Sequence, residues 1–392
     1  MHPRPGPSGA EGRTSEPFLS REVRTMELRA REGVDRVLLV CVGLLVAIAV
    51  LLLESALRGV ASGATLGAHL IRLGIALGVG VVAYRMDHRQ LARLSPALFL
   101  VALGLSAVAI TSGALRAGTR RWLEVGALTV QPGELAKISL VLLLAHLIAR
   151  SRHEPLSRRA TVGWIAASGA LVLAVAAQPD LGSAAILFGI GVGMVFFSGV
   201  TISRKWMLAA SGSAVLALPL IWVFGLRDYQ RIRVLSFLNP ESDPLGAGYQ
   251  TLQASIAVGS GGLFGTGWLQ GPQTNLQFLP APHTDFVFAV LAEEFGFLGV
   301  VAVLGLYLVL GLRLLQIAVE AVENKDPTGA FMVGGFFLMI HLQALYNIAM
   351  VAGIVPIKGF PLPFMSYGGN SLLIAAAAIG LAASVRRRNF LT

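Results

Sequence analysis

Long runs of apolar residues, separated by short polar stretches, fill most of this chain and restrict its fold more than any other feature. A transmembrane helix needs about 20 mainly apolar residues. Inside a bilayer, only helices and closed barrels satisfy the hydrogen bonds of their own backbone. Apolar residues make up 55% of the 392 residues and charged residues 13%, whereas a soluble domain carries about 25% charge. We therefore predict an all-α integral membrane protein.

Ten segments are long and apolar enough to be predicted as transmembrane helices. They cover residues 37–53, 65–83, 95–112, 134–149, 161–177, 182–200, 206–225, 286–312, 329–350 and 371–385. We predict one transmembrane domain over residues 37–388. Residues 1–36 are rich in Pro, Gly, Arg and Glu and lack the periodicity of a packed element, so we expect a disordered tail and not a signal peptide.

The basic residues predict how the chain is oriented in the membrane. With the amino terminus in the cytoplasm, about 21 of the 31 Lys and Arg residues fall on the cytoplasmic side and about 8 on the other side. Both termini are then cytoplasmic, and residues 226–285 form a large extracytoplasmic loop between spans seven and eight. The net charge of +10 is spread between apolar segments, which argues against nucleic acid as a partner.

The glycine-rich string 259–267 in this loop has neither a preceding strand nor the spacing of a phosphate-binding loop. We expect its glycines to serve tight turns and the close approach of helices.

Asp285 stands where the long loop meets the eighth apolar segment. An ionisable side chain at the membrane boundary costs free energy if it is left in lipid, so Asp285 is a candidate functional residue. An aspartate just ahead of a helix also caps free backbone N–H groups. The residues alone leave both interpretations open.

Further polar motifs fall on the same predicted side of the membrane. They are Arg120-Arg121-Trp122, Gln131-Pro132-Gly133-Glu134-Leu135-Ala136-Lys137, Gln178-Pro179-Asp180-Leu181-Gly182, Tyr249-Gln250, His283-Thr284-Asp285 and Pro361-Leu362-Pro363-Phe364-Met365-Ser366-Tyr367-Gly368-Gly369. In this order they resemble the SEDS family of bacterial cell-wall polymerases, which includes RodA, FtsW and SpoVE. The resemblance covers about residues 35–388, and residues 361–364 are more similar to RodA than to FtsW.

The resemblance implies a peptidoglycan glycosyltransferase that polymerises lipid II, a disaccharide-peptide on undecaprenyl pyrophosphate, at the outer face of the bacterial cytoplasmic membrane. It implies a role in cell elongation and shape, with a division or sporulation polymerase as the alternative. Asp285 matches the family's essential aspartate. The implied partner is a class B penicillin-binding protein, a transpeptidase. The chain departs from the family pattern at Gly133, Ala281 and Asn370, and the missing carboxylate at Ala281 puts in doubt a metal or acid role there.

Polymerisation of a sugar pyrophosphate needs a base for the attacking hydroxyl and cations for the departing pyrophosphate. Asp285 is our candidate base. Arg120 and Arg121 are candidate pyrophosphate ligands, since guanidinium groups match phosphate geometry. Glu134 and Lys137 lie three residues apart on a predicted helix, where they either contact substrate or form a buried pair. We also expect four neighbours of these motifs at the substrate site: His283, Thr284, Ser366 and Tyr367.

Other polar residues receive structural interpretations. We expect Asp180 to cap the sixth span, and His69 and Arg72 to reach towards the membrane surface as snorkelling side chains. No second histidine or cysteine stands near His283 at ligand spacing, so we predict no metal site. Assistance by Mg²⁺ or Mn²⁺ arriving with the pyrophosphate stays open.

A lipid flippase or other transporter and a scaffold for the transpeptidase are the competing functions. A transporter is expected to carry ionisable residues near the midplane of several spans, whereas here they gather on one side. A scaffold does not need an acid beside a basic cluster. The sequence therefore favours an inverting glycosyltransferase.

Overall fold

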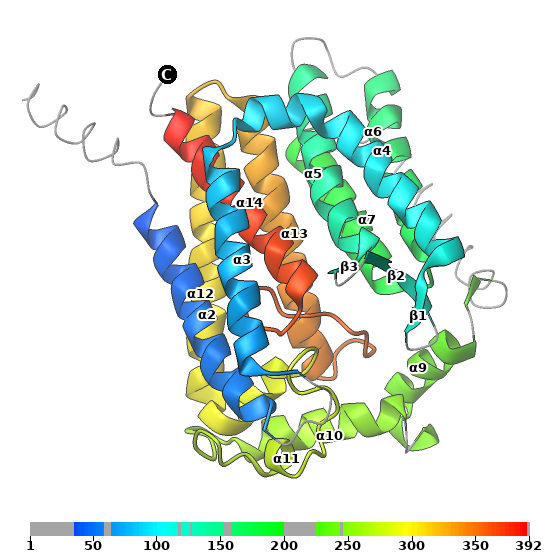
Figure 1. Cartoon of the computed structure of the whole chain (residues 1–392), viewed down its shortest axis with the longest axis vertical. Helices are drawn as coiled ribbons and strands as arrows, with labels where there is room; N and C mark the ends of the chain where they lie inside the picture. Colours follow the sequence, from blue (N-terminus) through cyan, green and yellow to red (C-terminus); the bar gives the residue numbers. More distant parts are fainter. Residues whose placement is uncertain are drawn as a thin grey trace, which may run out of the picture.

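The computed structural model describes residues 35–58, 64–116, 119–125, 128–151, 158–199, 225–226, 228–243 and 246–389. Within these ranges the chain forms a bundle of long helices (Figure 1). The bundle consists of α2 (Arg36–Ala56), α3 (Leu66–Arg85), α4 (His88–Ser112), α5 (Pro132–Ser151), α6 (Arg158–Ala176), α7 (Leu181–Phe197), α12 (Val287–Glu323), α13 (Pro327–Val351) and α14 (Gly369–Asn389).

These helices coincide with the predicted spans wherever the structure describes the chain. Seven of the described helices are long and apolar enough to cross a membrane, and α6 and α7 are shorter apolar helices. The predicted span 206–225, apart from its last residue, lies outside the described residues, as do residues 1–34 of the predicted tail. The structure therefore supports a multi-spanning helical membrane protein, and the count of ten spans stays a prediction.

Two helices run well beyond their predicted limits. Helix α4 begins seven residues before the predicted start, because Asp87 caps it by accepting a hydrogen bond from the Arg89 backbone N–H at 2.9 Å. Helix α12 continues eleven residues past residue 312, and Arg313 in this extension pairs with Asp35 at 2.6 Å. In both cases the sequence analysis marked only the apolar part of the helix.

A small sheet corrects the all-α prediction in one place. Strands β1 (Ala114–Arg116), β2 (Thr119–Val125) and β3 (Leu128–Val130) form a three-stranded antiparallel sheet in the order β1-β2-β3. Runs of three to seven residues are too short to give a firm alternation of apolar and polar residues. The sheet connects α4 to α5 and places Arg121 near the start of α5.

Helices α3 and α14 pack closely, because glycines face each other between them. A Cβ atom at Gly380 would collide with the backbone oxygen of Gly80. Small residues at helix interfaces allow this kind of backbone approach inside membranes. The contact fixes the later turns of α3 against the middle of α14.

Three helices of the predicted long loop lie across the end of the bundle opposite to the carboxyl terminus (Figure 1). They are α9 (Asp228–Leu238), α10 (Ala247–Ser260) and the short α11 (Pro272–Asn275), with a 3-10 turn at Pro240–Ser242. Helix α12 is interrupted near this end at Gly296, whose φ is 62°. The loop backbone supplies hydrogen bonds at the break: the N–H of Thr266 donates to the carbonyl oxygen of Glu293 at 2.9 Å.

The glycine-rich string serves this close contact, as the sequence analysis expected. A Cβ atom at Gly261 would collide with the carbonyl oxygen of Ala292, and one at Gly265 with that of Glu294. Glu293 holds the same loop by accepting hydrogen bonds from backbone N–H groups at the start of α11. The loop is thereby anchored to the kinked helix that follows Asp285.

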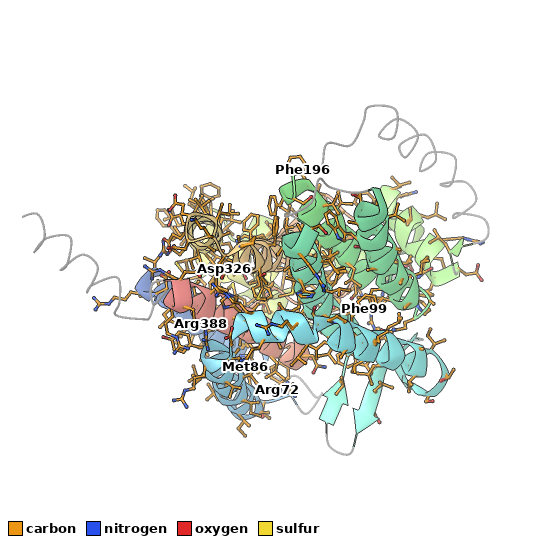
Figure 2. The ribbon with its side chains drawn as sticks, turned by 90° about the horizontal axis from the view of Figure 1, so that it is seen from above. Arg72, Met86, Phe99, Phe196, Asp326 and Arg388 are labelled. Carbon is orange, nitrogen blue, oxygen red and sulfur yellow. The ribbon has the colours of Figure 1, made fainter. Side chains whose placement is uncertain are left out.

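Ion pairs gather at the other end of the bundle. His88 contacts Asp326 at 2.6 Å, and Arg388 contacts Asp87 at 3.4 Å. Figure 2, viewed from this end, shows Asp326 and Arg388 close to the turn between α3 and α4 at Met86. The carboxyl-terminal arginines are therefore engaged in helix packing.

Candidate active site

A cavity of about 570 Å³ collects residues from six separate parts of the chain. It lies where α5, α7, α12 and α14 begin, so their preceding loops contribute to its wall. Among the residues predicted for the site, five line it: Arg121, Glu134, Thr284, Asp285 and Tyr367. Motifs that are far apart in the sequence thus contribute to one cavity.

Asp285 is part-exposed and lines this cavity. It stands two residues before the start of α12. Phe286 occupies the N-cap position of α12, and no side chain caps that helix. The capping interpretation of Asp285 is therefore wrong. Burial raises the pKa of Asp285 to about 6, while Arg121, Arg233 and a hydrogen bond from Thr284 act in the opposite direction.

Two residues that the sequence analysis missed hold Asp285 in place. The side-chain amide of Asn347, buried in α13, donates hydrogen bonds to the carbonyl oxygens of Asp285 at 2.8 Å and Phe360 at 2.6 Å. The carboxylate lies against the backbone of Gly359, where an added Cβ would be 2.8 Å from Asp285 Oδ2. Asn347 thereby ties the segment before α12 to residues 352–368, which we call the α13–α14 loop.

Lys137 does not reach the cavity wall. It is fully buried, and its Nζ donates to Glu134 Oε1 at 2.8 Å and to Gln343 Oε1 at 2.5 Å. The amide of Gln343 in turn donates to the carbonyl oxygen of Pro361 at 2.8 Å and to Ser371 Oγ at 2.9 Å. The structure therefore shows the buried-pair alternative for Glu134 and Lys137, with Glu134 left as the member that faces the cavity.

The amides of Gln343 and Asn347 gave a signal that the sequence analysis did not use. They are four residues apart within an apolar segment, so they share one face of α13. Polar side chains inside a membrane span face other protein groups. This spacing was sufficient to predict a polar face directed at the site.

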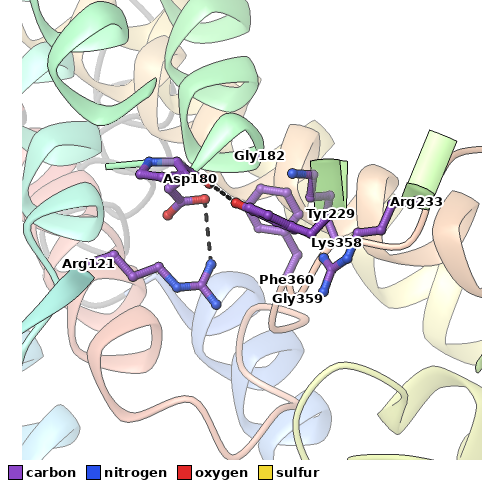
Figure 3. A pocket seen from close by; sticks show the side chains of 9 residues that line it. Arg121, Asp180, Gly182, Tyr229, Arg233, Lys358, Gly359 and Phe360 are labelled. Atoms are coloured by element: carbon purple, nitrogen blue, oxygen red, sulfur yellow. Dashed lines mark hydrogen bonds and ion pairs between the residues drawn. The ribbon is translucent and has the colours of Figure 1, made fainter. Parts of the chain in front are cut away.

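A smaller pocket of about 30 Å³ adjoins the cavity and shares Arg121, Gly359 and Phe360 with it (Figure 3). Arg121 Nη1 lies 3.8 Å from Asp180 Oδ1. Asp180 caps α7, as predicted, by accepting a hydrogen bond from the Ser183 backbone N–H at 3.2 Å. The backbone of Arg120 pairs with Leu115 in the sheet, and its side chain lies outside what the structure describes.

Two more cations line the smaller pocket, and the sequence analysis did not name either of them as a candidate site residue. Arg233 on α9 donates to the carbonyl oxygen of Ile357 at 3.4 Å. Lys358 has its pKa lowered to about 8 by burial and by Arg233 and Arg121, against the opposing effect of Asp180. The edge of the site is therefore strongly cationic.

Tyr367, Ser366 and His283 form the junction between two loops. The backbone N–H of Tyr367 donates to the carbonyl oxygen of His283 at 2.9 Å. The two rings are nearly perpendicular, with their centres 5.6 Å apart. Burial lowers the pKa of His283, which favours its neutral form. Ser366 is buried and its Oγ accepts a hydrogen bond from the Leu362 N–H at 2.7 Å. Of these three residues, Tyr367 lines the cavity.

Arg72 also lines the cavity, although the sequence analysis expected it to reach the membrane surface. Its guanidinium carbon lies 4.3 Å from the centre of the Tyr367 ring. Across the described residues, no group of three or more His, Cys, Asp or Glu side chains has the arrangement of a metal site. The polar groups that line the cavity include carboxylates, guanidiniums, hydroxyls and the side-chain amides of Gln131 and Asn370.

A bundle of apolar helices with a charged cavity where its polar loops begin defines a multi-spanning membrane protein with a site at the membrane boundary. Residues 34–390 match the family of FtsW, RodA and SpoVE, described as cell cycle proteins. The chain belongs to this family, which confirms the resemblance found in the motifs.

Similar proteins come from both branches of the family. The chain is 39% identical over 347 residues to the peptidoglycan glycosyltransferase MrdB of Escherichia coli K12, covering 87% of this chain and 92% of the relative. It is 36% identical to a probable peptidoglycan glycosyltransferase FtsW of Tolumonas auensis, covering 80% of each chain.

Two solved structures share the fold. A chain from a peptidoglycan synthase complex, studied for the coordination of polymerization and crosslinking, superposes with a TM-score of 0.76 at 29% identity and covers 92% of this chain and 100% of its own length. The rod shape determining protein RodA of Thermus thermophilus gives a TM-score of 0.65 at 28% identity and covers 91% of this chain and 98% of its own length.

Proposed function

We propose that this chain is an inverting peptidoglycan glycosyltransferase that polymerises lipid II, with Asp285 as its base. Relatives that match it over most of their length bear the name peptidoglycan glycosyltransferase. The observation that carries the proposal is Asp285 itself. It is a part-exposed carboxyl with a pKa of about 6, in the wall of a cavity that also presents guanidinium groups.

In the proposed reaction, the hydroxyl oxygen of the acceptor sugar attacks the anomeric carbon of the donor. The bond from that carbon to the pyrophosphate oxygen breaks and its electron pair leaves with the pyrophosphate, while the hydroxyl proton passes to Asp285. A carboxyl with a pKa of about 6 is ionised at neutral pH and more basic than an ordinary aspartate, which suits a general base. One displacement converts an α-linked donor into a β-linked product.

Cationic groups stabilise the leaving pyrophosphate in this proposal. Arg121 lines the cavity, and Arg120 precedes it in β2. Thr284, Glu134 and Tyr367 add substrate contacts from the cavity wall. The remaining members of the predicted site have a supporting role: Lys137 holds Glu134, Ser366 holds the α13–α14 loop, and His283 holds Tyr367.

We further propose ten spans within one domain over residues 37–388, with both termini in the cytoplasm and the 226–285 loop outside. The position of the carboxyl terminus, opposite to α9–α11, supports this orientation (Figure 1). A RodA-like role in cell elongation is favoured by the rod shape determining protein among the structural neighbours. A class B penicillin-binding transpeptidase is the proposed partner, since a structural neighbour comes from a synthase complex.

Purified full-length protein, supplied with lipid II in detergent, tests the proposal. Wild type with its transpeptidase is expected to form glycan strands, and Asp285→Asn is expected to form none. Asp228→Asn serves as the matched control, because its side chain is 96% exposed near the same end of the bundle. A fully active Asp285→Asn protein would refute the assignment of the base. Lipid II crossing liposome bilayers without polymer would instead select a flippase.

A further inference from the structure

Arg72, in the second turn of α3, is a cation of the cavity wall that the proposed mechanism leaves unused. Within the described part of the chain, no carboxylate lies within ion-pair distance of its guanidinium, whereas Arg121 faces Asp180 at 3.8 Å. An opposite charge already close by reduces the attraction that a cation exerts on a third, negative group. Arg72 is therefore the better placed of the two guanidiniums to attract an anion into the cavity.

One tyrosine holds Arg72 in this position. The Arg72 guanidinium carbon lies 4.3 Å from the centre of the Tyr367 ring, and Nη1 donates to the Tyr367 carbonyl oxygen at 3.3 Å. The side chain also packs on Gly369, where an added Cβ would be 3.4 Å from Arg72 Cδ. A cation over an aromatic face is attracted by the ring and loses freedom there.

Helix α3 contacts Tyr367 along a single stripe. The backbone N–H of Thr65 donates to Tyr367 Oη at 3.2 Å, and the ring of His69 stacks on the Tyr367 ring at 5.5 Å with an interplanar angle of 24°. Thr65, His69 and Arg72 follow one another at spacings of four and three residues, which places them on one helix face. The stripe thus docks the first two turns of α3 onto Tyr367.

The ring of His69 makes no hydrogen bond with the residues that the structure describes. Its side chain is 1% exposed. Its contribution is therefore the ring face that it presents to Tyr367. The sequence analysis expected this histidine to extend to the membrane surface, but the structure buries it.

Tyr367 also reaches the segment that carries the proposed base. Its N–H donates to the carbonyl oxygen of His283, two residues before Asp285. Ile75, one turn beyond Arg72, and Leu373 line the same cavity and give this part of the wall an apolar surface. A guanidinium beside an apolar surface matches a diphosphate that is joined to a hydrocarbon chain.

We infer that Arg72 is a second diphosphate-binding cation of the cavity, and that His69 is a positioning residue that sets Arg72 through the ring of Tyr367. This inference rests on the proposed function, in which donor and acceptor each carry a polyprenyl diphosphate. Two diphosphates then meet in every transfer. Arg121 serves one of them, and Arg72 serves the other.

Binding of undecaprenyl pyrophosphate to purified full-length protein in detergent, compared with uncharged undecaprenol, tests the inference without turnover. Arg72→Gln is expected to weaken diphosphate binding roughly 10- to 100-fold, the range for loss of charged hydrogen bonds, and to leave undecaprenol unchanged. Arg72→Lys is expected to fall in between, because lysine lacks the planar fork that stacks on a ring. Arg58→Gln is the matched control, since Arg58 pairs with Glu54 outside the cavity near the same end of α3.

Variants of His69 separate positioning from general stability. His69→Phe keeps a ring on Tyr367 and is expected to bind the diphosphate within threefold of wild type, whereas His69→Ala is expected to lose most of the affinity lost by Arg72→Gln. If His69 acts through Arg72, the double variant His69→Ala/Arg72→Gln binds no more weakly than Arg72→Gln alone. Thermal unfolding of each variant in the same detergent identifies any that fail to fold.

The outcomes distinguish this inference from the proposed function. Wild type that binds the diphosphate no better than undecaprenol contradicts the proposed substrate. Wild type that prefers the diphosphate, together with a folded Arg72→Gln protein of equal affinity, overturns the role of Arg72 alone. Additive losses in the double variant, or a His69→Phe protein as weak as His69→Ala, overturn the positioning role of His69.

Discussion

Replacement of Gly359 by alanine tests whether the position of the Asp285 carboxylate governs the reaction. The backbone of Gly359 has ordinary φ, so alanine fits its conformation. The new methyl group would lie 2.8 Å from Asp285 Oδ2, whereas ordinary contact begins near 3.4 Å. The carboxylate must therefore retreat by about 0.6 Å, the difference between these two distances, or the α13–α14 loop must move by as much.

This displacement is expected to lower the rate while the protein stays folded. A misplacement of about 1 Å in a reacting group costs up to about 100-fold in rate, so a retreat of about 0.6 Å predicts a fall in kcat of roughly 10-fold or more. An extra methyl group in a packed site typically costs about 1–3 kcal/mol of stability. Asn347 holds the backbone of Asp285 by a hydrogen bond. We therefore expect the side chain of Asp285, and not its backbone, to move away from the new methyl group.

The assay is lipid II polymerisation by purified protein, with thermal unfolding in the same detergent. Gly104→Ala in α4 is the control, because an added Cβ there meets nothing within 4 Å. Gly359→Ala is expected to remain folded, with an unfolding temperature lowered by a few degrees, and to lose activity, while Gly104→Ala keeps both. A folded Gly359→Ala protein with kcat within twofold of wild type would refute the link between this contact and catalysis.

Three further predictions concern the same site. In a pH–rate profile, the kcat/KM for lipid II is expected to fall as the pH drops through about 6, because protonated Asp285 cannot accept a proton. Arg121→Gln removes a cation that lowers the pKa of Asp285, so it is expected to move this fall, the acid limb of the profile, to higher pH. Lys137→Met leaves Glu134 buried without its ion partner and is expected to lower the free energy of unfolding by roughly 3–5 kcal/mol; adding Glu134→Gln should restore part of this loss in thermal unfolding. Asn347→Leu removes the hydrogen bonds to the carbonyl oxygens of Asp285 and Phe360, which predicts a loss of about 1–3 kcal/mol in stability and slower polymerisation. Unchanged acid limbs or unfolding temperatures would contradict the respective assignments.

Much of the fold could be predicted because membrane helices depend on a simple property. Length and apolarity located every bundle helix that the structure describes. The same criterion stopped at the last apolar residue, and so it missed the polar turns of α4 and α12, which are stabilised by Asp87 and by Asp35. It also missed the sheet at Ala114–Val130, whose strands are too short for a pattern.

The site was predictable as a set of residues but not as a geometry. Polar residues at one membrane side indicated Asp285, Arg121, Glu134 and Tyr367, which do line one cavity. Their roles depend on partners in distant segments, as when Gln343 draws Lys137 away from the wall. Arg72 was misjudged because a snorkelling arginine and a cavity arginine have the same sequence signature near a helix end.

The carboxylate of Asp180 lies beside Arg121, one of the two cations that lower the pKa of Asp285. Burial raises the pKa of Asp285, and Arg121 lowers it. Asp180 also faces Arg121, at 3.8 Å, so its charge offsets part of the field that Arg121 exerts on Asp285. Removal of that charge is therefore expected to strengthen the effect of Arg121 and to lower the pKa of Asp285, which makes it a weaker base.

Asp180→Asn isolates this effect, because asparagine caps a helix about as well as aspartate and the cap of α7 at Ser183 is retained. The variant is expected to move the acid limb of kcat/KM to lower pH, opposite in direction to Arg121→Gln. It should also lower the rate at neutral pH, since a less basic Asp285 accepts the hydroxyl proton less readily. An acid limb that moves upward in Asp180→Asn would show that Asp180 acts on the base by some route other than Arg121.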